Sequence, residues 1–542
     1  MRLYQQFRAS IVRSAVAGAG VLLFASGMPV SAFGQAAPAR PATQAAAQAT
    51  TAPTGTPISI DEAARMALEN NLNVQVEKLN PQIQVLGVSR AAAAYAPLFT
   101  SSVNRGSGTR PPEDFNTSAG TTVTTNSNFR TSAGLQQNLR RFGGNYAVSF
   151  DGTRDTSNYV NNFFNPNLGA GLNAAFTQPL LRNFKIDQLR AALIQSRNQV
   201  SMADLQLQQR ITQTSRNARA AYYNLVGALE GLKVAEGSLE VARTSLRNNQ
   251  TRVEVGTMAP IDITAAEAEV ASNEEQVIIQ QAAIESAQDN LRATIMNPSQ
   301  PDFWNTRFLP NEPPVVTARV IDVDAAIRNA LATRTDLQEF KKNMENTEIN
   351  LKLAQNQKLP AVDLNARYGL AGVAGTQFDI DSSTFPPTKI PASQRSFTEA
   401  LKDVFANDFK TWSLSVSVTY PLGTSQADAA YAQAKLQKQQ EQTQLAGIEL
   451  QITTGVREEG RRVNTNLKRV EATRRARELA EKRLAADNKR FEVGLATTFE
   501  LLQSQRDLSR AKQAELRATI DYNQSLVDFQ LVQVAPLGGG GF

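Results

Sequence analysis

The chain has 542 residues, 20% of them charged, and a formal net charge of +6. It contains no histidine, which removes the commonest general base and the commonest metal ligand, and no cysteine, which excludes disulfides and a lipidated cysteine. These absences disfavour an enzyme, and the sequence predicts no catalytic residue, no cofactor and no metal site.

Residues 1–34 have the pattern of a secretory signal peptide. Arg2, Arg8 and Arg13 precede an apolar stretch at 15–24, and the small residues that follow predict cleavage after Gly34. That stretch is too short to span a bilayer as a helix, and no longer apolar run follows. Without the three arginines the formal charge is +3, which is too weak to indicate a nucleic-acid partner. Residues 35–57, rich in Ala, Pro and Thr, are predicted to be a linker.

The rest of the chain is an internal duplication. Residues 60–97 align with residues 323–360 at an offset of 263, and residues 252–256 align with residues 490–494 at an offset of 238. We therefore predict a first repeat at 58–296, a Pro-rich connection at 297–322, a second repeat at 323–535 and a Gly-rich tail at 536–542.

Each repeat is predicted to read helix, strand region, long helix, tight turn, helix. The long helices are expected at 183–255 and 425–493, and the first would measure about 110 Å at 1.5 Å per residue. The shorter helices, expected at 58–96, 258–296, 323–359 and 497–533, nearly match the long ones when two are placed end to end. Such lengths indicate helical hairpins and not globular cores.

Apolar residues recur every seven positions along these helices, as in a coiled coil. In the first repeat they are Leu225, Leu232, Leu239, Leu246 and Val253, opposite Ile263, Val270, Val277, Ile284 and Leu291. The second repeat has a more polar stripe, with Val456, Val463, Val470, Leu484 and Phe491 opposite Leu501, Leu508, Tyr522 and Phe529. Taken alone, this pattern would indicate only a rod or a dimeric coiled coil.

Alternating segments between the helices indicate membrane strands. Strands are predicted near 98–104, 170–180, 361–371 and 411–421, each with one apolar and one polar face, although a soluble sheet would also alternate. The predicted lipid face consists of Trp412, Leu414, Val416, Val418, Tyr420, Val362, Leu364, Tyr368 and Leu370. Four strands cannot close a barrel, so several chains must share one. A further hairpin is predicted at 129–154, and its place inside or outside the barrel stays open. Residues 104–128, 155–169 and 371–408 are expected to be external loops.

Two such repeats behind a signal peptide resemble the TolC-like outer membrane factors. The resemblance covers about residues 58–535, and its marks are the duplication, the Pro-Leu pairs before the long helices, and the turns at 255–257 and 493–495. It implies a mainly α protein whose homotrimer forms a twelve-stranded β-barrel in the outer membrane and a long coiled-coil tube in the periplasm. It also implies the exit duct of a tripartite efflux pump or type I secretion system, with a periplasmic adaptor protein and an inner-membrane pump as partners.

The resemblance assigns roles to the two turns. Val255, Gly256 and Thr257, with Val493, Gly494 and Leu495, would form the periplasmic tip that contacts the adaptor. The glycines also have a simpler explanation, because a tight turn after a helix needs a residue with positive φ.

Two acids follow the glycines by six residues. Asp262 and Glu500 stand where the family often places an acid near the closed pore, and they could line a gate that favours cations. Helix capping is the competing explanation, because Thr497 and Glu500 fit a capping box while Pro260 and Asp262 fit the first and third helical positions. Ala496 and Gln503 replace an arginine and an acid of some relatives, so the family's closure is not transferred.

The alternative function is an exported structural or adhesive stalk with a coiled coil and a membrane anchor. The duplication disfavours it, since a stalk needs no strand set within each repeat. The cargo, whether drug, metal or protein, stays open.

Overall fold

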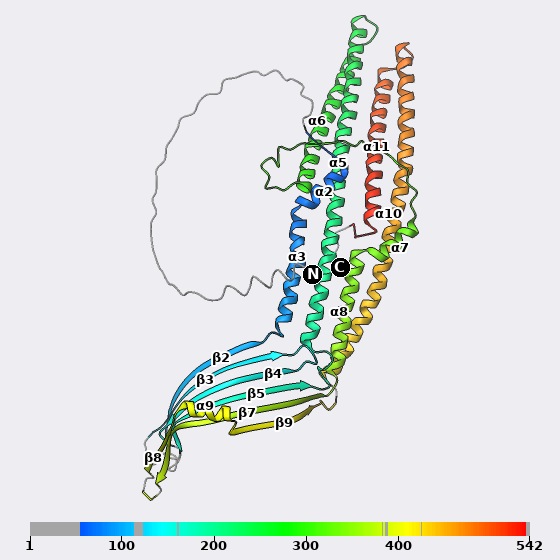
Figure 1. Ribbon diagram of the computed structural model, residues 1–542. Helices are drawn as coiled ribbons and strands as arrows, with labels where there is room; N and C mark the ends of the chain where they lie inside the picture. Colours follow the sequence, from blue (N-terminus) through cyan, green and yellow to red (C-terminus); the bar gives the residue numbers. More distant parts are fainter. Residues whose placement is uncertain are drawn as a thin grey trace, which may run out of the picture. The chain divides into compact units, whose positions relative to one another are not determined.

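The computed structural model describes residues 55–112, 123–159, 162–381, 383–384, 388–423 and 425–537. The predicted signal peptide, most of the predicted linker and most of the Gly-rich tail lie outside these residues. The described part is mainly helical and contains one antiparallel seven-stranded sheet and one two-stranded sheet (Figure 1). None of its helices has the length and apolarity that a membrane-spanning helix requires.

The helices repeat one plan in the two halves of the chain. The first half contains α2 (Ile60–Asn70), α3 (Leu72–Ala93), α5 (Gln188–Glu254) and α6 (Ile261–Ile295), and the second contains α7 (Val323–Thr333), α8 (Thr335–Gln357), α10 (Gln426–Glu492) and α11 (Thr498–Leu531). The long helices α5 and α10 have 67 residues each. Near the sheet the order of packed neighbours is α3, α5, α8, α10, and toward the turns it is α6, α5, α11, α10 (Figure 1). Four helices therefore lie side by side both near the sheet and near the turns.

The helices predicted at 58–96 and 323–359 are each interrupted once, which corrects the expectation of continuous helices. The breaks fall at Asn71 and Arg334, which are equivalent at the offset of 263 and both have extended backbone. Asn71 accepts a hydrogen bond from the Asn73 N–H and donates one to the Thr294 carbonyl. Arg334 is buried, forms a bidentate pair with Asp336 and donates to the Val532 carbonyl. Asn71 thus competes with the helical pattern by bonding to backbone two residues away, whereas Arg334 is held by Asp336 and by backbone 198 residues away.

Two apolar clusters hold the helices together. One lies between the first-half helices, with Tyr222, Leu225 and Leu291 fully buried. The other lies between the second-half helices around Val456 and Tyr522. Leu225, Leu291 and Val456 belong to the predicted seven-residue stripes, so these stripes do supply the contacts between helices.

The large sheet receives strands from both halves. Its long members are β2 (Leu98–Arg110), β3 (Thr124–Asn138), β4 (Asn145–Ser157), β5 (Phe164–Pro179), β7 (Ala361–Asp381) and β9 (Phe409–Thr419), in that order, all antiparallel. The short β8 (Thr388–Arg395) pairs with the far part of β7, beyond the end of β9. The hairpin predicted at 129–154, whose place inside or outside the barrel was not decided, is thus β3–β4 and lies between β2 and β5. Much of the chain expected as loops at 104–128, 155–169 and 371–408 is strand.

Part of the predicted linker and part of the predicted inter-repeat connection are also ordered as strands. β1 (Thr56–Ile58) pairs in parallel with β6 (Phe308–Pro310). The buried Gln288 side chain of α6 both donates to the Phe308 carbonyl and accepts from the Phe308 N–H. Because Ile58 and Phe308 are buried in the first apolar cluster, this small sheet covers the side of the first helical group.

Candidate functional site

The first predicted tip is a tight turn between α5 and α6. The Gly256 N–H bonds to the Val253 carbonyl and the Thr257 N–H bonds to the Arg252 carbonyl, which is the Schellman pattern that ends many helices. Gly256 has φ of +76°, a conformation that costs an L side chain energy. The glycine is therefore required by the turn itself.

The second predicted tip, between α10 and α11, repeats this turn. The Gly494 N–H bonds to the Phe491 carbonyl, the Leu495 N–H bonds to the Arg490 carbonyl, and Gly494 has φ of +77°. A Cβ built on either tip glycine, Gly256 or Gly494, meets no atom within 4 Å. Both turns are thus open on their outer side, and the glycines' simpler explanation is sufficient for their geometry.

The two tips lie beside each other and expose apolar side chains. The Arg252 guanidinium stacks over the Phe491 ring at 4.5 Å and donates to the Phe491 carbonyl, which joins α5 to α10 just before the turns. Val255 is 66% exposed, and Val493 and Leu495 are each 71% exposed. Ile261 and Phe499, in the first turns of the following helices, are similarly exposed. The tips therefore present several apolar side chains that no described residue covers.

The two candidate gate acids differ in their bonding. Glu500 accepts a hydrogen bond from the Thr497 N–H at 2.8 Å, while its own N–H donates to the Thr497 hydroxyl, which is a complete capping box. Asp262 lies in the first turn of α6, and within the described chain its carboxylate has no hydrogen bond or ion pair. Pro260 precedes α6 instead of being its first residue, and no side chain caps that helix. Capping thus accounts for Glu500 and leaves Asp262 unassigned.

A second difference lies one turn further from the tips. Asp487 of α10 is buried and accepts a 2.5 Å hydrogen bond from the Ser504 hydroxyl of α11. This bond, helped by the charges of Arg483 and Arg490, lowers the pKa of the Asp487 carboxyl. The equivalent residue of the first half at the offset of 238 is Asn249, which is buried but does not ionise.

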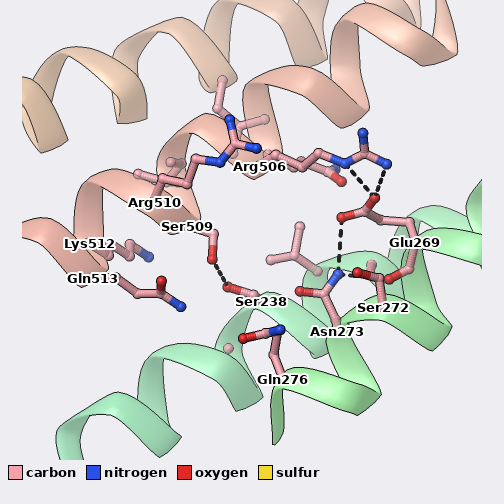
Figure 2. A pocket seen from close by; sticks show the side chains of 16 residues that line it. Ser238, Glu269, Ser272, Asn273, Gln276, Arg506, Ser509, Arg510, Lys512 and Gln513 are labelled. Atoms are coloured by element: carbon pink, nitrogen blue, oxygen red, sulfur yellow. Dashed lines mark hydrogen bonds and ion pairs between the residues drawn. The ribbon is translucent and has the colours of Figure 1, made fainter. Parts of the chain in front are cut away.

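Polar side chains link the two helical hairpins, α5–α6 and α10–α11, on the sheet side of the tips, around a cavity of about 420 Å³ (Figure 2). Glu269 of α6 is buried and pairs with Arg506 of α11 at 2.6 Å, while Asn273 donates to the same carboxylate. The Ser238 hydroxyl of α5 donates to the Ser509 hydroxyl of α11 at 3.0 Å. The sequence did not predict these contacts, because a charged residue on one helix does not indicate which residue of another helical hairpin it will pair with.

One face of the sheet is apolar across all six long strands. Directly opposed residues of antiparallel strands share a face, so Tyr368 lies beside Trp412 and Leu364 beside Val416. The same face continues through Leu172, Ala174 and Phe176 of β5, Tyr146, Val148 and Phe150 of β4, Ala133 and Leu135 of β3, and Phe99 of β2. All predicted lipid-face residues in β7 and β9 lie on it, and Tyr420 follows β9 and is exposed.

The opposite face is polar and hydrogen-bonded. Asn173 donates to Asp151, the Thr177 hydroxyl donates to the Asn365 side chain, and Asn365 donates to the Ser417 hydroxyl. These bonds connect β4, β5, β7 and β9. The sheet thus separates an apolar surface from a polar one.

Helix α9 (Phe397–Ala406) lies on the apolar face across β5 and β7 (Figure 1). Ala400 and Val404 are buried against Ala170 and Ala374, and Leu370 packs at the edge of this cluster. Leu370, predicted to face lipid, therefore contacts this helix instead. An external loop was predicted at 371–408, so α9 was not predicted, although Ser396 and Glu399 form a capping box.

Comparisons with known proteins agree with this architecture. The family model "Outer membrane efflux protein" matches residues 146–295 and 326–532. "Outer membrane protein TolC" of Escherichia coli K12 is 22% identical over 316 residues, which are 56% of this chain and 58% of the relative. The aligned region thus spans less than two thirds of that relative.

Solved structures show the same fold. The outer membrane channel CmeC of Campylobacter jejuni superposes with a TM-score of 0.60 at 14% identity, covering 88% of this chain and 85% of CmeC. The outer membrane protein VceC of Vibrio cholerae gives a TM-score of 0.59 at 16% identity, covering 88% and 97%. Since the family model matches well over half of the sequence, the chain belongs to the outer membrane efflux protein family and is an outer-membrane protein that extends into the periplasm.

Proposed function

We propose that three copies of this chain form the outer-membrane exit duct of a tripartite efflux pump or a type I secretion system. Substrate would pass from a periplasmic adaptor and an inner-membrane pump through the helical tube and the barrel to the exterior. The helices would form the tube, and the large sheet would supply each copy's sector of the barrel.

The observation that carries this proposal is the pair of exposed tips. Each tip lies at the end of a long helix that starts beside the sheet, about 100 Å away for 67 helical residues. Val255, Val493 and Leu495 are exposed there together, and apolar side chains gathered at one place favour a protein partner. A docking adaptor would cover them and would also find open space at both glycines.

The two faces of the sheet support the rest of the path. A membrane barrel has an apolar outer face and a polar lumen, and the sheet has one face of each kind. The lumen would then be lined by Asp363, Asn365 and Arg367 of β7 and the serines of β9. Both signs of charge occur among these residues, so this surface favours neither cations nor anions strongly.

Asp262 is our candidate for the acid at the periplasmic entrance. Its carboxylate is unpaired within the described residues, unlike that of Glu500, so its charge is free to act on a passing ion. Substituting Asp262→Asn should lower the preference of the open channel for cations, whereas Glu500→Gln should change it less.

A photo-crosslinking amino acid at Leu495, in the cells that normally make this protein, tests adaptor contact. We expect cross-links to a periplasmic adaptor, identified by mass spectrometry. The matched control is Leu450, which is similarly exposed but lies 42 residues before the end of α10 at Glu492. The same adaptor cross-linked equally from both positions, or from neither, would contradict docking at the tip.

Conductance in planar lipid bilayers separates the duct from the alternative stalk. A duct should open, at least in variants that lack the Glu269–Arg506 pair between the hairpins. A folded oligomer that never conducts, in either form, would favour the stalk.

A further inference from the structure

The β3–β4 hairpin is an integral part of the large sheet. β3 pairs with β2 from Leu98 opposite Gln136 to Arg110 opposite Thr124, and β4 pairs with β5 from Asn145 opposite Thr177 to Asp155 opposite Asn167. The hairpin also continues both faces: Leu135 and Val148 lie on the apolar face, while Ser132 and Ser149 lie on the polar face. A hairpin outside the membrane would not need this continuity.

The width of the sheet matches the width of the helical layer to which it is joined. Strands about 4.8 Å apart and tilted by about 40° each occupy about 6.3 Å of circumference, so six strands span about 38 Å. Four helices side by side at about 10 Å each span about 40 Å. Four strands would span only about 25 Å, so the six-stranded sheet comes closer to the width of the four helices.

We propose that three copies close a barrel of eighteen strands, not the twelve that the family resemblance implies. This inference rests on the proposed function, because it takes the sheet to be a sector of a shared membrane barrel. Each chain contributes six strands to the width of its sheet, since β8 only extends the sheet beyond the end of β9. Among the six long strands the free edges are those of β2 and β9, and an open edge in lipid is costly.

The directions of the edge strands suit this closure. β2 runs away from the helices after α3, and β9 returns toward the helices before α10. The β2 edge of one copy would therefore pair antiparallel with the β9 edge of the next, and all eighteen strands would be antiparallel, as an even-numbered barrel requires.

The duplication also predicts the register between copies. Within the chain, β5, the last strand of the first half, pairs with β7, the first strand of the second half, with Phe176 opposite Ala366. The Pro-Leu pairs at 179–180 and 421–422 are 242 residues apart, and at this offset Phe176 is equivalent to Val418. Ala366 is equivalent to Val103 at the offset of 263. Val103 of one copy should therefore lie opposite Val418 of the next, and both lie on the apolar faces of their strands.

Because the chain has no cysteine, paired cysteines can test this arrangement in the membrane-embedded protein. Oxidation of Val103→Cys with Val418→Cys should join copies into a covalent ladder that ends at the trimer. The matched control, Val103→Cys with Ser417→Cys, puts the second thiol on the opposite face and should cross-link far less. A ladder ending at the dimer would close twelve strands from two copies and would overturn the proposal.

Two further pairs within one chain distinguish eighteen strands from twelve. Val103→Cys with Thr131→Cys should cross-link, since these residues are directly opposite in β2 and β3. If the β3–β4 hairpin lay outside the barrel, β2 would pair directly with β5 in the register that β7 and β9 have. Ala366 of β7 lies opposite Leu414 of β9, and their equivalents in the first half are Val103 and Leu172. In that case Val103→Cys would cross-link to Leu172→Cys.

The outcomes separate this inference from the proposed function. Cross-linking between copies together with the Val103–Leu172 product would leave the shared barrel standing and overturn the eighteen strands. No cross-linking between copies, with the Val103–Thr131 product still formed, would remove the shared barrel itself.

Discussion

The first half of the chain contributes four long strands to the sheet, whereas the second half contributes β7, β9, the short β8 and helix α9. Their helices, by contrast, have nearly the same lengths, the same breaks and the same tip turns. The halves therefore differ mainly where they form the sheet. The difference suggests that the helical plan is constrained by packing between the halves, while the sheet could gain a hairpin because an antiparallel sheet accepts two strands without reversing its neighbours.

Matched positions within the helices nevertheless hold different chemistry. Asn71 and Arg334 both end a helix, Asn249 and Asp487 occupy the same buried place, and Asp262 and Glu500 follow the same glycine turn. Each pair allows one half to serve as the control for the other.

The largest expected difference is at the helix breaks. Substituting Arg334→Met leaves the Asp336 carboxylate, whose side chain is only 10% exposed, without its ion-pair partner and should lower the free energy of unfolding by about 3–5 kcal/mol. Substituting Asn71→Ala removes two neutral hydrogen bonds and should cost about 1–2 kcal/mol. Chemical unfolding of the detergent-solubilised protein, followed by helical circular dichroism, measures both. Equal losses would mean that the charged pair adds nothing over the neutral one.

The two tip turns should lose similar stability when their glycine is replaced. Replacing Gly256 or Gly494 by alanine forces an L residue to positive φ and should destabilise each turn by about 1–2 kcal/mol, with no added clash. Hydrogen exchange of the adjacent amides measures the local effect. As a control, Gly447→Ala in the interior of α10, where a Cβ also has open space, should be neutral or stabilising. Loss at one tip only would show that the turns are not equivalent.

Acidification should loosen the second tip selectively. The pKa of Asp487 is lowered in the folded protein, so its stabilising contribution is present above the pKa of the unfolded chain, about 3.9, and is lost as the pH falls through the folded value. The first tip has Asn249 at that place, and Ala266 where the second has Ser504, so it lacks this dependence. Amide exchange at the two tips, each normalised to unstructured peptides, should diverge below about pH 4. In Asp487→Asn the divergence should vanish; if it persists, another group is responsible.

Much of this fold could be predicted from the sequence, because the seven-residue stripes and the glycine turns are local patterns and the duplication can be found by comparing the two halves directly. The helix break at Arg334 could not, since a buried arginine is stable only beside Asp336 and the Val532 carbonyl, which lies 198 residues away. The full strand lengths were not predicted because segments with glycines and small polar residues, such as 104–110, have the composition of loops, although their backbone pairs fully with β3. At the site, Gly256 and Gly494 were sufficient to predict the two turns, whereas the Glu269–Arg506 ion pair could not be predicted because it depends on contact between two helical hairpins.

The smallest expected difference concerns the two acids after the turns. Glu500→Ala removes half of a capping box and should destabilise the start of α11 by about 0.5–1 kcal/mol, whereas Asp262→Ala should leave the start of α6 nearly unchanged. Ala259 stands where Thr497 stands in the second half, so the first tip lacks the hydroxyl that a capping box needs. Ala259→Thr should therefore let Pro260 join α6 as its first residue, which makes Asp262 the third. It should stabilise the start of the helix by a similar amount, and only while Asp262 is present to complete the box. Hydrogen exchange at the first turn of α6, in the single and double variants, checks this. A gain that survives Asp262→Ala would mean that the threonine acts alone and that the acid stays free for another role.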